Sequence, residues 1–189
     1  MKDFKRMDKL HPIKWSPDKI ARLWDYYANN PSYASQYFSS HSGIYILGQC
    51  RKYISFKDKD VLDFGCGRGH LIGYLLGMGT RRVWGMDFSE ESFNAVNNKF
   101  SGRKNFAGAV HIRDFPSSLK DDSIDISILV EVVEHVDDSG LDLILREIYR
   151  ILRPGGWVVI TTPLREDLEA SKTVCPECGC IFHRWQHLR

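Results

Sequence analysis

The sequence predicts an α/β protein built on a parallel β-sheet with helices on both faces. Short apolar segments, such as DVLDF at residues 60–64 and WVVITT at residues 157–162, have the length of buried strands. They alternate with longer segments of helical periodicity, and turn residues such as GCGRG at 65–69 separate the two kinds. Because strands that alternate with helices are joined by right-handed crossovers, we expect them to be parallel and covered on both faces.

Each strand segment is rich in apolar residues, whereas each helical segment places its apolar residues three and four positions apart. The clearest helix is residues 139–152, where Leu141, Ile144, Leu145 and Ile148 share one face. The expected strands are residues 60–64, 81–87, 108–114, 123–131 and 157–162, and the expected helices are residues 16–30, 42–54, 69–78, 89–100 and 139–152.

Composition places the chain among ordinary globular proteins. Its 189 residues are 43% hydrophobic and 26% charged, with a net charge of +2 that favours neither polyanions nor polycations as partners. No apolar run has the length of a membrane span, and the N-terminus lacks the hydrophobic stretch of a signal peptide. Residues 1–15 are expected to form a loosely ordered, basic leader. Three of the five cysteines fall within six residues, which suits a metal better than disulfides and indicates a cytoplasmic protein.

A glycine-rich turn follows the first strand of the predicted sheet. Gly65, Gly67 and Gly69 allow a tight turn and a close approach of the backbone to a ligand. The second strand ends in Asp87, 18 residues after Gly69, where a carboxylate can accept both hydroxyls of a ribose. His70 stands where the dinucleotide motif requires its last glycine, which argues against NAD. These residues predict a ligand site at the carboxyl ends of the strands.

Four motifs together resemble those of the class I S-adenosylmethionine-dependent methyltransferases. They are VLDFGCGRG, VWGMDFS, DDSIDISILVEVVEHV and EIYRILRPGGWVVITTP, in the family's order and within residues 60–163. The resemblance implies a Rossmann-like, doubly wound sheet with strand order 3-2-1-4-5 in this chain. It also implies S-adenosylmethionine as the cofactor and a methyltransferase activity.

The resemblance assigns a place at the cofactor to particular residues. Those of the glycine turn would hold its methionine part, Asp87 its ribose and Phe88 its adenine, while the end of strand four would lie beside the methyl group. Arg113 precedes Asp114, where the family often has a small residue. This departure weakens the case for the contact between Asp114 and the adenine. The predicted cofactor-binding residues are Asp63, Gly65, Cys66, Gly67, Gly69, Asp87, Phe88, Asp114, Phe115, Val130 and Glu131.

The segment EVVEH after strand four concentrates groups that could take part in catalysis. Methyl transfer mainly needs alignment and exclusion of water, so no residue type is obligatory. If the segment is helical, Glu131, Glu134 and His135 share a face. They either brace the loop, which we favour, or bind magnesium or manganese, as the similar segment does in ubiquinone-pathway O-methyltransferases and small-RNA terminal ribose methyltransferases. Glu131 and His135 are the candidate catalytic residues.

The aromatic N-terminal region indicates the kind of substrate. Tyr26, Tyr27, Tyr33, Tyr37 and Phe38 would roof the pocket, although core packing explains at least half of them. We therefore expect O- or C-methylation of a small apolar or aromatic molecule of the ubiquinone-pathway type, with no membrane partner. A metal-assisted RNA ribose methyltransferase and a non-catalytic binding module are the alternatives, and a nucleic-acid partner is disfavoured.

The C-terminal stretch predicts a zinc knuckle. Cys175, Cys178, His183 and His187 have the spacing C-x2-C-x4-H-x3-H, and the Cys-Pro-x-Cys-Gly turn aims two thiolates at one point. Cys180 is left outside this set. The knuckle is expected to be a structural clip after strand five rather than a nucleic-acid module.

The chain is therefore expected to have three parts. These are an N-terminal leader with a helical lid (1–56), a cofactor-binding domain (57–163) and a zinc-knuckle-like segment (164–189). The methyltransferase fold that the sequence resembles has seven strands, and the sequence predicts only five before Pro163. We expect the native protein to continue past Arg189 with a helix and two strands, which would make the knuckle an insertion.

Overall fold

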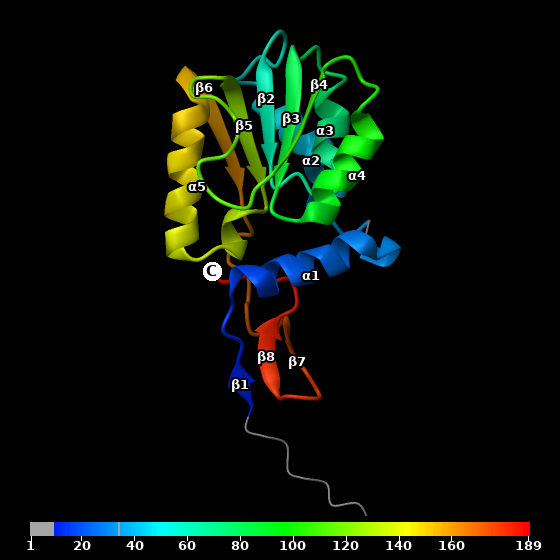
Figure 1. The fold of residues 1–189 in the computed structure, drawn as a ribbon, viewed down its shortest axis with the longest axis vertical. Helices are drawn as coiled ribbons and strands as arrows, with labels where there is room; N and C mark the ends of the chain where they lie inside the picture. The colour runs from blue at the N-terminus through cyan, green and yellow to red at the C-terminus, as the bar shows by residue number, and fades with distance from the viewer. Residues whose placement is uncertain (1–9, 34) are drawn as a thin grey trace, which may run out of the picture.

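The computed structural model describes residues 10–33 and 35–189 and contains a five-stranded parallel sheet at its centre. The sheet order is β4-β3-β2-β5-β6, which is 3-2-1-4-5 along the chain, and every neighbouring pair is parallel (Figure 1). The predicted fold class and strand order are thus confirmed. The strands are β2 (Asp60–Phe64), β3 (Arg82–Asp87), β4 (Phe106–His111), β5 (Ile124–Val130) and β6 (Leu152–Thr161).

Helices cover both faces of the sheet, as the alternating pattern requires. Leu47, Leu71 and Val96 bring α2, α3 and α4 to one apolar core, and Ile144 and Ile148 bring α5 to the other. The two cores use alternate side chains of the same strands because successive residues of a strand point to opposite faces. The helices are α1 (Pro17–Asn29), α2 (Phe38–Cys50), α3 (His70–Leu75), α4 (Glu90–Phe100) and α5 (Asp138–Ile151).

Side-chain caps fix the starts of α4 and α5, one as predicted and one earlier than predicted. Ser89 caps α4 as its type suggests, since its Oγ accepts a hydrogen bond from the Ser92 N–H at 3.1 Å. Helix α5 is capped by Asp137, whose Oδ1 accepts from the Gly140 N–H at 2.8 Å, so the helix begins before Ser139. Asp137 therefore sets the start of α5.

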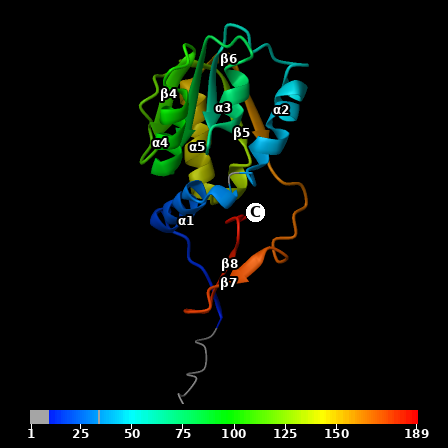
Figure 2. The same ribbon diagram turned by 90° about the vertical axis from the view of Figure 1, so that its right-hand side faces the viewer.

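A second, three-stranded sheet lies beyond the carboxyl ends of the main one. Strands β7 (Lys172–Val174) and β8 (Cys180–His183) form an antiparallel hairpin, and β1 (His11–Pro12) adds to β8 in parallel. The expected leader is therefore wrong for residues 11 and 12, because the backbone of His11 donates to Gly179 O at 3.2 Å. Residues 1–9 of that leader lie outside the described residues. Figures 1 and 2 both show this sheet below α1, with the C-terminus returning toward α1.

The main sheet ends at β6, which pairs with β5 alone within the described part of the chain. Trp157, Val158 and Ile160 are each at least 40% exposed along this strand. Edge strands with apolar side chains are normally covered in proteins.

None of the described helices is long and apolar enough to cross a membrane.

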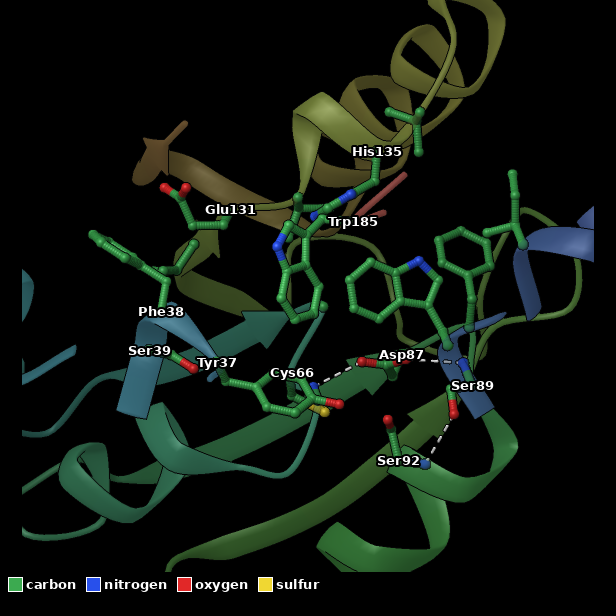
Figure 3. A pocket seen from close by; sticks show the side chains of 18 of the residues that line it. Tyr37, Phe38, Ser39, Cys66, Asp87, Ser89, Ser92, Glu131, His135 and Trp185 are labelled. Carbon is green, nitrogen blue, oxygen red and sulfur yellow. Dashed lines mark hydrogen bonds between the residues drawn. The ribbon is translucent and has the colours of Figure 1, made fainter. Parts of the chain in front are cut away.

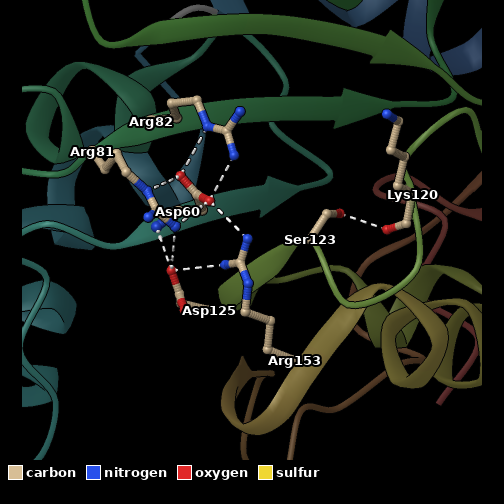
Figure 4. Close-up of polar contacts among 7 residues, drawn as sticks. All are labelled: Asp60, Arg81, Arg82, Lys120, Ser123, Asp125 and Arg153. Atoms are coloured by element: carbon tan, nitrogen blue, oxygen red, sulfur yellow. Dashed lines mark hydrogen bonds and ion pairs between the residues drawn. The ribbon is translucent and has the colours of Figure 1, made fainter.

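An ionic cluster closes the amino ends of the strands, opposite the pocket described below (Figure 4). Asp60 is fully buried, and its carboxylate accepts hydrogen bonds from the guanidinium groups of Arg81, Arg82 and Arg153 at 2.6–3.1 Å. Burial alone would raise the pKa of Asp60, but the hydrogen bonds from the three arginines outweigh it and hold that pKa well below its usual range. The carboxylate therefore ties β2 to β3 and β6.

Candidate functional site

A pocket of about 270 Å³ lies where β2, β3 and β5 end and α1 crosses over them. Its floor is formed by the turn after β2, the end of β3 and the end of β5, and its roof by α1 and the start of α2 (Figure 3). Open parallel sheets bind their ligands at such carboxyl ends. The position of the pocket agrees with the site predicted from the sequence.

The turn after β2 is shaped by its glycines. Gly65 has a φ of +73°, and a Cβ there would lie 2.5 Å from Cγ2 of Val132, so only glycine fits. The Gly65 N–H donates to Met86 O at 2.7 Å, which holds the turn against β3. The backbone of Gly65 and Gly67 consequently forms part of the pocket surface.

Asp87 connects the end of β3 to this turn. Its Oδ2 accepts a hydrogen bond from the Gly67 N–H at 2.8 Å, and its Oδ1 accepts one from the Ser89 N–H at 2.8 Å. Asp87 also lines the pocket, between the glycine turn and Ser89 in Figure 3. A carboxylate has about four acceptor sites, so it retains capacity for hydroxyl groups of a ligand.

Asp63 lies behind the turn rather than in the pocket. It is 3% exposed, and its Oδ2 has no hydrogen-bond partner among the described residues. Burial, and next the negative charge of Asp87, raises the pKa of Asp63 to about 8. Two carboxyl groups thus flank the turn, and the one that faces the pocket is Asp87.

The predicted cofactor-binding residues divide into two groups. Asp63, Gly69, Asp114 and Phe115 do not line the pocket; Asp114 is exposed, and Phe115 contacts Phe88 with ring centroids 6.1 Å apart. Their roles stay predictions. The residues that the structure does bring to the pocket are Gly65, Cys66, Gly67, Asp87, Phe88, Val130 and Glu131.

The roof is aromatic and uses two of the five aromatic residues named for it, in line with the expectation that packing explains at least half of them. Tyr37 and Phe38 line the pocket, whereas Tyr27 and Tyr33 do not line it and pack against Trp185, which does. Tyr26 joins this second aromatic group through both tyrosines. Residues that were not predicted for the site include Ile20, Ala21, Trp24, Gln36, Ser39, Ser92, Val132, Val136 and Trp185.

A signal for two of them was present in the sequence. Ile20 and Trp24 lie four residues apart on the apolar face of the helix predicted at residues 16–30. This face could have been assigned to the roof, because it covers the carboxyl ends of the strands. No local pattern indicates Trp185, which reaches the pocket from the C-terminal segment.

The EVVEH segment is not one helix. Val133–His135 forms a single 3-10 turn, η2, and Glu131 precedes it with a φ of +54°, so Glu131, Glu134 and His135 do not share a helical face. The Thr161 Oγ donates to Glu131 Oε1 at 2.9 Å. Glu131 and His135 both line the pocket, while Glu134 is completely buried behind them.

The environment of η2 changes the ionisation of both of its polar residues. Burial, and next the charge of Glu131, raises the pKa of Glu134 to about 7. Burial, and next the charge of His187, lowers the pKa of His135 to about 3. His135 is therefore a neutral imidazole at pH 7, with a ring lone pair that can accept a hydrogen bond or bind a metal.

The four ligands predicted for the zinc knuckle do not converge, which corrects that assignment. Cys175 and Cys178 lie in the turn of the β7–β8 hairpin, where Lys172 pairs with His183 at the opposite end. A strand rises about 3.3 Å per residue, so β8 carries His183 away from the turn. Two sets of three metal-compatible residues occur in the described chain, and neither contains a cysteine. They are Glu134, His135 and His187, and Glu166, His183 and His187.

The sheet order, the glycine turn, the carboxylate at the end of β3 and the pocket above them define a cofactor-binding α/β domain. Comparison with known proteins identifies the family. The profile described as "Methyltransferase domain" matches residues 62–160, more than half of the chain, and the chain belongs to this family.

Individual relatives agree with the family assignment. A probable S-adenosylmethionine-dependent methyltransferase of Mycolicibacterium smegmatis is 32% identical over 57% of this chain and 39% of its own length. A ubiquinone biosynthesis O-methyltransferase of Thiobacillus denitrificans is 31% identical over 55% of this chain and 44% of its own length. The chain thus spans less than half of these relatives.

A solved structure supports the fold. The phosphoethanolamine N-methyltransferase 1 of Haemonchus contortus, in complex with phosphoethanolamine and S-adenosylhomocysteine, superposes with a TM-score of 0.66 at 18% identity. The match covers 86% of this chain and 35% of the other one. At this identity the likeness supports the fold alone.

Proposed function

We propose that the protein is an S-adenosylmethionine-dependent methyltransferase that methylates an oxygen or carbon atom of a small apolar or aromatic molecule. The observation that carries the proposal is the joint lining of one pocket by the glycine turn, Asp87 and aromatic side chains. Family membership and the likeness to a ubiquinone biosynthesis O-methyltransferase support it.

The residues present fit this cofactor. Gly65 and Gly67 line the pocket without a Cβ, which suits a ligand that lies against the turn. Asp87 would accept hydrogen bonds from the ribose hydroxyls, and Phe88, 38% exposed beside it, offers an apolar face to the adenine. When bound, S-adenosylmethionine supplies a methyl group attached to a positively charged sulfonium sulfur. That sulfur is an excellent leaving group because it departs as a neutral sulfide.

The chain's own contribution to the reaction is alignment, exclusion of water and, for a hydroxyl acceptor, removal of a proton. Tyr37, Phe38 and Trp24 line the pocket with aromatic surface, which favours an apolar acceptor. Glu131 and His135 both reach the pocket and are the candidate bases. Glu131 already accepts a hydrogen bond from Thr161, and the lowered pKa of His135 makes its imidazole a weak base.

Further features of the protein belong to the same proposal. We propose a three-part organisation (1–56, 57–163 and 164–189), a zinc ion at the cysteine turn, and magnesium or manganese beside the EVVEH segment. All five cysteines are free, which suits a reducing cytoplasmic setting.

The test is a transfer assay with methyl-labelled cofactor and a panel of phenols, catechols and apolar carbon acids, with RNA in parallel. We expect label in a small acceptor and none with Asp87→Ala. Label in RNA alone would instead establish the ribose methyltransferase alternative. S-adenosylhomocysteine binding without transfer to any acceptor would favour a non-catalytic binding module and contradict the proposal.

A further inference from the structure

Three histidines and two glutamates gather at one wall of the pocket. They come from η2, from the loop after β6 and from the C-terminal segment. The ring centroids of His135 and His187 are 4.8 Å apart, and those of His183 and His187 are 4.6 Å apart. Such a concentration of imidazole and carboxylate groups exceeds what packing of the core requires.

The cluster leaves buried polar atoms without partners. Among the described residues, Oε1 of Glu134, Nδ1 of His135 and Nε2 of His183 are buried and make no hydrogen bond. An unsatisfied buried polar group costs about 1–3 kcal/mol, and more when it is charged. One ligand atom each of Glu134, His135 and His187 lies within 4.8 Å of the others. Ligand atoms around one tetrahedral zinc ion are roughly 3.4 Å apart, so the three side chains would draw together to bind it.

The hydrogen bonds of the histidines indicate which ring nitrogens have a lone pair free for a metal. Nδ1 of His187 faces Oε2 of Glu166, so this nitrogen carries the proton and Nε2 retains its lone pair. A histidine that binds a metal through one ring nitrogen usually donates the N–H of its other ring nitrogen to a carboxylate or a carbonyl. Glu166 therefore acts as a positioning residue for His187.

His183 has the opposite arrangement. Its Nδ1 accepts a hydrogen bond from the His187 N–H at 3.1 Å, so its Nε2 carries the proton. This nitrogen lies 3.4 Å from Glu166 Oε1 and makes no hydrogen bond among the described residues. A protonated nitrogen cannot bind a metal. Of the two sets, only Glu134, His135 and His187 then has free lone pairs on all three members.

The chain holds the C-terminal segment in place for this role. The Leu188 N–H donates to Glu134 O at 2.7 Å, and Gln186 donates to His135 O. Gln186 Oε1 in turn accepts from Trp24 Nε1 at 2.8 Å, which links the segment to α1. His187 is thus fixed against η2 by hydrogen bonds on both sides.

We propose that Glu134, His135 and His187 bind one divalent transition-metal ion at the pocket wall, with Glu166 positioning His187. Two imidazoles and one carboxylate suit zinc or manganese and leave coordination positions open. Because His135 and His187 line the pocket, the ion would be accessible to an oxygen atom of the substrate. The site differs from a Glu131, Glu134 and His135 set because His187 replaces Glu131.

The test measures zinc and manganese binding by calorimetry and by elemental analysis after dialysis. It uses the Cys175→Ser/Cys178→Ser protein, in which the cysteine turn cannot bind metal. We expect one ion per chain, lost by at least 100-fold in affinity in His187→Gln and weakened 10–100-fold in Glu166→Gln. The exposed His41 provides the matched control, and His41→Gln should bind as the parent does.

Several outcomes would overturn the proposal. One is the absence of metal binding in the Cys175→Ser/Cys178→Ser protein. The others are an unchanged metal affinity in His187→Gln and a loss of affinity in His41→Gln as large as that in His187→Gln. S-adenosylhomocysteine binding and the urea midpoint of each variant report whether it is folded, and His135→Gln replaces any variant that is not. Because cofactor binding is measured separately, failure of the metal site can be distinguished from failure of the proposed methyltransferase function.

Discussion

Asp87 offers the sharpest test of the cofactor assignment, because its carboxylate has two tasks at the same place. One is to hold the Gly67 and Ser89 N–H groups at 2.8 Å, and the other is to present its remaining lone pairs to the pocket. Asp87→Ala removes both, whereas Asp87→Asn retains one oxygen acceptor and loses the charge. The pair of variants therefore separates the charge from the shape of the turn.

The magnitude follows from the number of bonds. A hydrogen bond to a charged group contributes about 1.5–3 kcal/mol. Two bonds to ribose hydroxyls would contribute about 3–6 kcal/mol, which is roughly 10²- to 10⁴-fold in affinity at about 1.4 kcal/mol per tenfold. Asp87→Asn should lose about half of this free energy, or roughly 10- to 10²-fold.

Calorimetry with S-adenosylhomocysteine measures these affinities, and urea unfolding shows whether each variant keeps its fold. The exposed Glu90, at the start of α4, gives a matched control. Glu90→Gln removes a nearby negative charge that does not line the pocket, and it should change affinity less than threefold. A folded Asp87→Ala protein that binds within threefold of the wild type would refute the ribose assignment.

Two further predictions concern buried carboxyl groups. Asp60→Asn should lower the free energy of unfolding by about 2–4 kcal/mol in urea at pH 7, because three guanidinium groups lose their common acceptor. Since the pKa of Asp60 is lowered on folding, its stabilisation exists above about pH 4 and is lost as the pH falls, so the variant should show a flatter acid limb below that pH. The pKa of Asp63 is raised on folding to about 8, so the stability of the unliganded wild type should fall as the pH rises from about 4 through 8, by at most about 1.4 kcal/mol per pH unit. Urea unfolding at pH 6 and 9 should show this slope abolished in Asp63→Asn, and an unchanged slope would contradict the raised pKa of Asp63.

The central sheet could be predicted because its signals are local. The buried segment 60–64 is wholly apolar except for its two aspartates, and the turn after it carries the glycines that a left-handed backbone requires. Helix α5 follows its apolar period over four turns. The alternation of such elements restricts the topology to a parallel, doubly wound sheet.

The remainder depended on contacts that no local pattern records. Strand β1 consists of two residues, and its pairing with β8 joins positions about 170 residues apart by backbone hydrogen bonds alone. The spacing of Cys175, Cys178, His183 and His187 suggested a compact knuckle, but spacing does not reveal that a strand intervenes. Glu131 was placed on a helical face because its left-handed backbone cannot be recognised from its residue type.

The C-terminal segment is best understood as a wall of the pocket rather than as a separate clip. It supplies Trp185 and His187 to the lining, and its backbone is bonded to η2 through Leu188. Gln186 spans the gap between His135 and Trp24, so the segment also fixes α1 above the cofactor site. A change that released this segment would therefore open the roof and remove a metal-compatible imidazole at the same time. The C-terminal wall of the pocket consequently depends on residues from both ends of the chain, whereas the glycine turn and Asp87 belong to the ends of the central strands.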